Sequence, residues 1–279
     1  MQLKVVGVGP QKTGTTWLDM CLREHPRLCF PKGTKETFFF DGHFDKGWSW
    51  YWPHFQHCSK DQFCIEIGPS YFDVPETATT IYQHNPDCRI IVNLRDPAAR
   101  SFSLYLHHRS RGRFNCDFLE AVRKMPRIIE SSRYSMHLRR WIEMFGREQI
   151  LIILQDDISA FPEEVLERVY KFIGIGSLPP PVFAHEHVNV ASVTVFPSLA
   201  RFFTQKARWF RDRRLYGCVN LLIKLGLKRT YARSSGTLPR LEPEIRKILI
   251  QEFEPDIKYV EEILNRPLPA WRHIGFSKR

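Results

Sequence analysis

The sequence contains no long apolar segment, because no uninterrupted hydrophobic run approaches the roughly 18 residues that a bilayer-spanning helix needs. Internal repeats and low-complexity tracts are also absent. The first apolar segment begins almost at residue 1, which leaves no room for a signal peptide before it. A sequence from which a membrane anchor had been removed would show the same absence of long apolar segments. These absences nevertheless favour a cytoplasmic protein without stable membrane insertion.

Closely spaced cysteines are missing too. The seven cysteines are odd in number and scattered, and none forms a C-x-x-C pair, which argues against a zinc ribbon and a redox pair. His43, His54 and His57 lie near one another in sequence but lack a paired ligand set. We therefore predict mostly reduced, buried cysteines and no metal site.

Size and composition fit one elaborated globular domain over residues 1–279, since 43% of the residues are hydrophobic and 25% are charged. The 41 Lys and Arg exceed the 30 Asp and Glu and give a net charge of +11. This excess favours anionic ligands, namely nucleotides, sulfated or phosphorylated acceptors, nucleic acid or a membrane surface. Composition does not choose among them.

Four apolar segments have the pattern of buried strands, at residues 3–8, 63–67, 89–94 and 149–154. Helical patterns lie between and after them, at residues 15–25, 75–84, 117–124, 134–145 and 243–253. Asp156 and Asp157 are expected to cap a further helix that ends at Ile173.

The first strand runs into a glycine-rich turn that also holds a lysine, Gly9-Pro10-Gln11-Lys12-Thr13-Gly14-Thr15-Thr16-Trp17. Free backbone N–H groups and the positive end of a helix converge on an anion in such a turn. Gly9 and Gly14 match the outer glycines of G-x-x-x-x-G, but Thr15 stands where a nucleoside triphosphatase carries its lysine. The turn therefore predicts a site for another phosphate ester, with an ordinary strand–helix turn as the alternative.

A second anion site is predicted where the 89–94 strand ends. Asp96 can cap the following helix and Pro97 suits its first turn. Arg95 leaves the tip of the strand and Ser103 lies two turns along the helix, so both can reach one phosphate. In the alternative interpretation, Arg95 and Arg100 are ordinary surface charges.

These two segments resemble the cofactor motifs of sulfotransferases, which use 3′-phosphoadenosine 5′-phosphosulfate (PAPS). The turn at residues 11–17 resembles their 5′-phosphosulfate loop, and residues 94–105 match Leu-Arg-Asp-Pro-x-x-Arg-x-x-Ser-x-Tyr, their 3′-phosphate motif, at every specified position. The motifs are most similar to those of heparan-sulfate-type enzymes, and we expect a soluble bacterial-type member. The resemblance implies an α/β fold, with a P-loop-like parallel β-sheet flanked by helices and a helical insert near 180–230.

The resemblance also assigns roles to residues. Glu36, in a segment similar to the family's Glu-x-x-Phe-Phe, corresponds to its general base, and Lys12 stabilises the leaving group. The implied cofactor-binding residues are Gln11, Lys12, Thr13, Gly14, Thr15, Thr16, Trp17 (against adenine), Arg95, Ser103, Arg233, Ser235 and Gly236. No metal is implied. Without the resemblance, a solvated Glu36 paired with Lys32 or Lys35 is the simpler interpretation.

Three departures from the family pattern stand out. Ile67 occupies the position of an active-site lysine and Gly68 that of a threonine, so one positive charge near the transferred group is missing. Ser235 stands where the family is typically basic. Either Lys12 and another cation supply enough positive charge near the transferred group, or the acceptor is itself cationic and supplies the missing charge.

The predicted activity is transfer of a sulfuryl group from PAPS to a hydroxyl, or an amine, of a saccharide or a small secondary metabolite. A P-loop small-molecule kinase is one alternative. The other is a non-catalytic module that binds nucleic acid or membranes through the basic, aromatic region at 201–233. For the sulfotransferase we expect no nucleic-acid partner, and the sequence does not give the oligomeric state.

Overall fold

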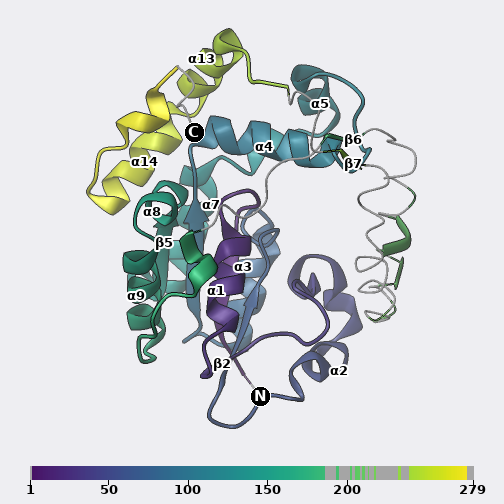
Figure 1. The fold of residues 1–279 in the computed structure, drawn as a ribbon, viewed down its shortest axis with the longest axis vertical. Helices are drawn as coiled ribbons and strands as arrows, with labels where there is room; N and C mark the ends of the chain where they lie inside the picture. Colours follow the sequence, from purple (N-terminus) through teal and green to yellow (C-terminus); the bar gives the residue numbers. More distant parts are fainter. Residues whose placement is uncertain are drawn as a thin grey trace.

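The computed structural model describes residues 2–185 and 239–274, the backbone of 193–194 and 232–233, and scattered positions between 202 and 217. A five-stranded sheet forms its centre (Figure 1), made of β1 (Leu3–Gly9), β2 (Leu28–Cys29), β3 (Phe63–Ile67), β4 (Arg89–Leu94) and β5 (Ile150–Leu154). The strand order is β2-β3-β1-β4-β5, and all four neighbouring pairs are parallel. The predicted parallel α/β fold is confirmed.

Helices cover both faces of this sheet because the strand residues alternate between two apolar cores. Val6, Val8, Ile90 and Val92 pack with helices α3 (Pro75–His84) and α7 (Tyr134–Phe145). Val5, Ile91 and Ile153 face the other way and pack with α1 (Thr15–Arg23) and α9 (Pro162–Ile173). Successive side chains of a strand point to opposite faces of the sheet. A parallel sheet covered by helices on both faces therefore needs apolar residues at successive positions of its strands.

The other helices and a second, two-stranded sheet lie around this core. They are α2 (Trp48–Tyr51), α4 (Pro97–Arg109), α5 (Phe118–Lys124), α6 (Arg127–Glu130), α8 (Gln155–Ala160), α13 (Pro243–Glu252), α14 (Glu254–Leu264) and the small β6–β7 pair (Val193–Thr194 with Ala232–Arg233). No helix in the described part of the chain is long and apolar enough to cross a membrane. The predicted helical insert at 180–230 falls mostly outside the described residues, and the single domain over 1–279 stays a prediction.

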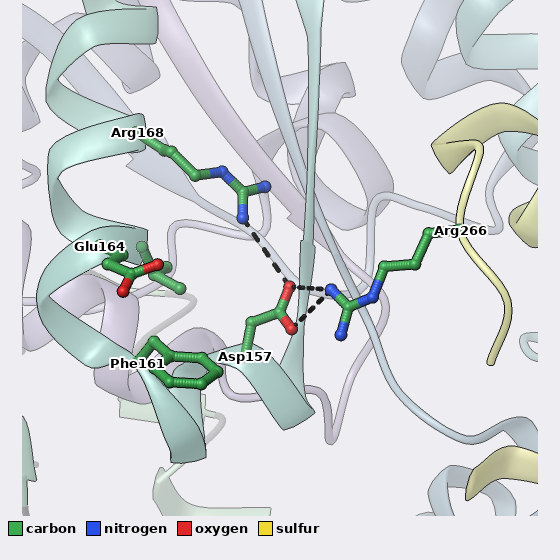
Figure 2. Close-up of a pocket in the computed structure, with 6 residues that line it drawn as sticks. Asp157, Phe161, Glu164, Arg168 and Arg266 are labelled. Carbon is green, nitrogen blue, oxygen red and sulfur yellow. Dashed lines mark hydrogen bonds and ion pairs between the residues drawn. The ribbon is translucent and has the colours of Figure 1, made fainter. Parts of the chain in front are cut away.

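The acidic pair after β5 differs from the prediction. Asp156 and Asp157 do not cap the helix that ends at Ile173, because they lie inside the separate helix α8 and Phe161 occupies the N-cap position of α9. Asp157 accepts two hydrogen bonds from Arg266, at 2.8 and 3.0 Å, and also faces Arg168 (Figure 2). Asp156 accepts a hydrogen bond from the indole of Trp271, at 2.8 Å. The pair therefore anchors the C-terminal segment rather than capping α9.

The C-terminal helix α14 also holds the fold through a buried carboxylate. Asp256 is 2% exposed and accepts hydrogen bonds from the backbone N–H and the hydroxyl of Ser135, at 2.8 and 2.6 Å. Ser135 lies in the first turn of α7, where backbone N–H groups have no partner within the helix. This contact fastens α14 to α7, beside the sheet.

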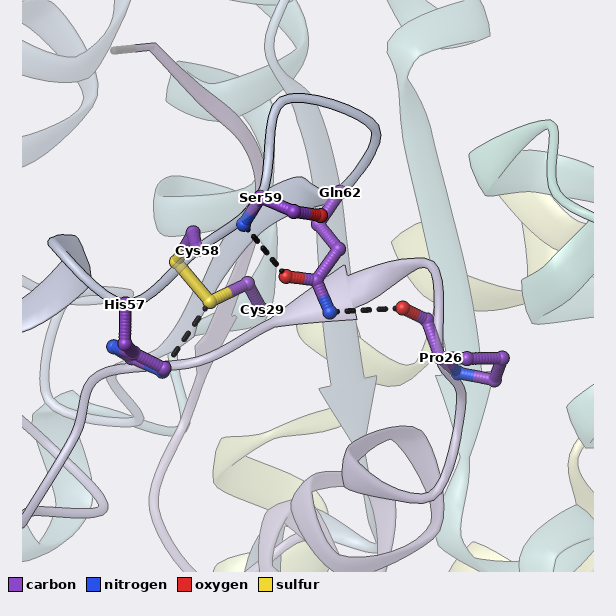
Figure 3. Close-up of a disulfide and its surroundings, with 6 residues drawn as sticks. All are labelled: Pro26, Cys29, His57, Cys58, Ser59 and Gln62. Carbon is purple, nitrogen blue, oxygen red and sulfur yellow. Dashed lines mark hydrogen bonds between the residues drawn. A yellow bond between two sulfur atoms is a disulfide. The ribbon is translucent and has the colours of Figure 1, made fainter.

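The prediction of mostly reduced cysteines holds for four of the six described cysteines, and one pair is the exception. Cys29, at the end of β2, forms a disulfide with Cys58, 29 residues later (Figure 3). The two meet because the intervening segment folds back onto β2, where the Lys32 N–H donates to the carbonyl of His54, at 2.9 Å. Among the other described cysteines, three are buried and free and Cys116 is half-buried and free. The bond counts against the predicted cytoplasmic location, since disulfides are rare in the reducing cytosol.

Candidate active site

The loop between β1 and α1 has the geometry of an anion cradle. Lys12 and Gly14 both have left-handed backbone conformations, with φ of 75° and 92°. The buried hydroxyl of Thr13 donates to the Pro10 carbonyl at 2.7 Å and closes the turn. A Cβ on Gly9 would lie 2.4 Å from the Pro69 carbonyl oxygen, so only glycine fits there. Left-handed residues in a closed turn that leads into a helix are typical of loops whose backbone N–H groups bind an anion.

The tip of β4 is held in place by polar contacts. Asp96 accepts hydrogen bonds from the N–H groups of Ala98 and Ala99, at 2.9 and 3.1 Å, and so caps α4. Arg246 of α13 donates to the same carboxylate at 2.6 Å. The hydroxyl of Tyr134 donates to the carbonyl of Arg95 at 2.7 Å. The backbone from which the Arg95 side chain departs is therefore fixed from two sides.

The two predicted anion motifs meet. The Arg95 guanidinium donates to the backbone carbonyl of Lys12 at 3.4 Å, across the adjacent strands β1 and β4. Since parallel strands end at the same edge of the sheet, residues 10–14 and 95–103 surround one region. This arrangement suits a ligand with two separate phosphate groups.

Arg100, the second arginine of the β4 motif, is not a surface charge. It is fully buried and donates to the hydroxyl of Ser132 and to the carbonyl of Ile128. Burial lowers the pKa of Arg100 to about 10. This arginine thus joins α4 to α6.

A residue that the sequence interpretation missed is His107, one helical turn beyond Ser103 on α4. Burial, followed by the positive charges of Arg111 and Lys12, lowers the pKa of His107 to about 2. The charge of Lys12 therefore acts on this part of α4. The four-residue spacing from Ser103 was the available signal.

Acidification is expected to destabilise the protein partly through His107. Below about pH 6.5 the His107 imidazole is protonated in the unfolded chain but stays neutral in the folded protein. The free energy of unfolding therefore falls as the pH drops from that value toward 2. In urea unfolding, His107→Gln should reduce the stability lost between pH 7.5 and pH 5 by on the order of 1–2 kcal/mol. The exposed His273 gives a matched control, His273→Gln. Equal losses in wild type and His107→Gln would contradict this assignment.

Glu36 lies between β2 and the aromatic segment, close to the cradle. Its carboxylate pairs with Lys35 at 3.3 Å, and the Lys35 ammonium also donates to the Thr16 hydroxyl at 3.1 Å. The side chain of Glu36 is 20% exposed. The predicted ion pair between Glu36 and a neighbouring lysine is therefore present. It lies beside the loop between β1 and α1, because Lys35 also contacts Thr16.

The segment that carries Glu36 is fastened to the sheet by the buried Glu66 of β3. Glu66 accepts hydrogen bonds from the N–H and hydroxyl of Thr37, at 2.8 and 2.5 Å, and from the hydroxyls of Tyr51 and Tyr71, at 2.8 and 3.0 Å. Burial raises the pKa of Glu66, and these donors partly oppose the shift. Because Thr37 follows Glu36 directly, the network restricts where the Glu36 carboxylate can lie.

For four other predicted cofactor-binding residues, the structure shows either a different contact or no side chain. The Trp17 ring is 4% exposed and its N–H donates to the Ala184 carbonyl at 2.8 Å, so its contact with adenine stays a prediction. The backbone of Arg233 forms part of β7, but its side chain lies outside the described residues. Ser235 and Gly236 lie outside the described residues altogether.

One cluster has the composition of a metal site. Within the described residues, Cys29, His57 and Cys58 bring ligand atoms within 4.8 Å of one another. The two sulfur atoms are bonded to each other, so neither is a thiolate in this state. The cluster lies at the disulfide, on the segment that follows β2.

Comparison with known proteins assigns the family. The sulfotransferase domain matches residues 3–189, more than half of the chain. This chain belongs to the sulfotransferase family. Members use PAPS as sulfuryl donor, which agrees with two anion motifs at one edge of the sheet.

This sulfotransferase is similar to parts of larger animal enzymes. It is 28% identical over 302 residues to bifunctional heparan sulfate N-deacetylase/N-sulfotransferase 4 of Mus musculus, covering 99% of this chain and 32% of that protein. It is 29% identical over 297 residues to bifunctional heparan sulfate N-deacetylase/N-sulfotransferase 2 of Homo sapiens, covering 96% and 30%. The chain therefore spans about a third of the length of these relatives.

A solved structure shares the fold of this sulfotransferase. The sulfotransferase from Alicyclobacillus acidocaldarius has a TM-score of 0.70 and 22% sequence identity, covering 98% of this chain and 100% of that chain. At this identity the likeness concerns the fold alone.

Proposed function

We propose that this protein transfers a sulfuryl group from PAPS to a hydroxyl or an amine of a saccharide or small-molecule acceptor, without a metal. The contact between Arg95 and the Lys12 backbone carries the proposal, because it brings two anion motifs to one edge of the sheet. A donor with phosphate groups at its 3′ and 5′ positions suits that spacing. The names of the heparan sulfate relatives support a saccharide acceptor, and the chain's net charge of +11 favours an acidic one.

In the proposed mechanism the acceptor oxygen or nitrogen attacks sulfur from the side opposite the leaving phosphate. The bond from sulfur to the phosphate oxygen breaks as the bond to the acceptor forms, and Glu36 takes the acceptor proton. Lys12 stabilises the negative charge that grows on the departing oxygen. The backbone N–H groups of 11–16 hold the 5′-phosphate, and Arg95 and Ser103 hold the 3′-phosphate. The second product is adenosine 3′,5′-bisphosphate.

Titration calorimetry with adenosine 3′,5′-bisphosphate tests this function directly. Wild-type protein should bind the bisphosphate equally well with and without a metal chelator, and should transfer labelled sulfuryl from PAPS in excess chelator. A P-loop kinase would instead require ATP and magnesium. Absence of binding heat from folded wild-type protein would refute the proposal.

Arg95→Ala is expected to weaken binding of the bisphosphate by about 10- to 100-fold, because a charge-assisted hydrogen bond to the 3′-phosphate contributes about 1.5–3 kcal/mol. Adenosine 5′-phosphosulfate has no 3′-phosphate, so its affinity should change little. The exposed Arg123 on α5 provides the control variant Arg123→Ala. Equal weakening of both ligands would place Arg95 away from the 3′-phosphate.

A further inference from the structure

The end of β3 supplies no cation to the site. Ile67, at the position to which the motif resemblance assigns a lysine, is fully buried in an apolar cluster with Val5 and Ile91. Its side chain packs so closely on β1 that a Cβ added to Gly7 would lie 3.0 Å from it. This position therefore contributes packing alone, and the charge that developing sulfuryl oxygens require must come from another element.

Lys35 has the required position. Its ammonium contacts the Thr16 hydroxyl at 3.1 Å and the Glu36 carboxylate at 3.3 Å. Thr16 belongs to the predicted 5′-phosphosulfate loop, and Glu36 is the proposed proton acceptor. The ammonium thus connects the predicted donor loop with the proposed proton acceptor.

The backbone next to Lys35 is held in place by hydrogen bonds to the sheet. Thr37, two residues later, is 3% exposed and bound to Glu66 on β3 through its N–H and hydroxyl. Lys35 itself follows β2, which pairs with β3 in parallel, so both strands lead to the same edge of the sheet. The side chain of Lys35 is 32% exposed, so it is only partly covered by the rest of the protein.

We propose that Lys35 is a catalytic residue that contacts the transferred sulfuryl group and replaces the cation absent at position 67. The proposal rests on the proposed function. Lys35 forms no bond and moves no proton, since the proton goes to Glu36 and the leaving electron pair to the phosphate oxygen. Its ammonium neutralises charge on the sulfuryl oxygens while sulfur passes between two oxygens, or from oxygen to nitrogen.

The decisive comparison is between PAPS and adenosine 3′,5′-bisphosphate, which lacks the sulfuryl group. In calorimetry without acceptor, Lys35→Met should weaken PAPS binding about tenfold, the lower end for a charge-assisted hydrogen bond, and change bisphosphate binding less than about twofold. Lys35→Arg should keep the wild-type preference for PAPS because it retains the charge. The exposed neighbour Lys32 supplies the control Lys32→Met, which should bind both ligands as wild type does.

The outcomes that would overturn the proposal can be told apart. Unchanged PAPS affinity in Lys35→Met, or equal weakening for both ligands, would exclude a contact with the sulfuryl group. A similar loss of PAPS preference in Glu36→Gln would show that Lys35 acts through Glu36. If Lys35→Met fails to fold by circular dichroism, Lys35→Gln takes its place. If wild-type protein binds neither ligand, the proposed function itself is wrong.

Discussion

Glu36→Gln is expected to lower turnover by about 10²- to 10⁴-fold, the range that a general base contributes. The amide has nearly the shape of the carboxylate but cannot accept the acceptor proton. The change also removes the ion pair with Lys35, but the anchor of the segment at Thr37 and Glu66 remains. The measurement is initial-rate transfer of labelled sulfuryl from PAPS, with an acceptor found in a screen of sugars, phenols and guanidinium compounds.

The control for this variant is Glu24→Gln, which neutralises an exposed carboxylate beyond the last turn of α1. Both variants should melt within a few degrees of wild type and bind adenosine 3′,5′-bisphosphate normally. Near-normal turnover by Glu36→Gln would remove the assignment of Glu36 as the base while leaving the donor site intact.

Lys12→Ala should reduce turnover by about 10²- to 10³-fold, the effect of removing one preorganised group that faces developing charge. Lys12 has a φ of 75°, and alanine in this left-handed conformation carries a similar steric cost to lysine. The loss should therefore come from the missing ammonium rather than from a collapsed loop. The same transfer assay measures it, with the rate at saturating PAPS as the quantity to compare.

Lys4 on β1 gives the matched control, since it is exposed and its ammonium donates to the nearby Gln2. Lys4→Ala should transfer sulfuryl at the wild-type rate. If Lys12→Ala retained full turnover while binding PAPS normally, charge on the departing oxygen would have to be stabilised by a different group.

The sheet could be predicted from the sequence because four of its strands are mostly apolar segments that are followed by glycine or polar residues. The order of the strands in the sheet could not be read from the sequence. The carboxyl ends of parallel strands lie at the same edge of the sheet, however, so Lys12 and Arg95 could be expected near each other. β2 is only two residues long and gives little periodic signal. α14 is not among the predicted helices, and its Pro255 lies in the first turn, where proline is tolerated.

The contacts that organise the proposed acceptor side could not be predicted. The contacts of Lys35 with Thr16, of Thr37 with Glu66, and the Cys29–Cys58 bond all depend on how residues 30–57 fold back over the sheet. That segment is rich in aromatics and has no simple period, so its path is set by tertiary packing. Local propensity carries little information where packing decides the conformation.

The disulfide has a practical consequence for anyone who assays this enzyme. It turns residues 29–58 into a closed covalent ring that includes Lys35 and Glu36. One protease nick inside that ring leaves two fragments that migrate together on a gel until a reductant separates them. A single band under non-reducing conditions is therefore compatible with a severed chain next to Glu36, and preparations should be compared with and without reductant before lost activity is attributed to a mutation.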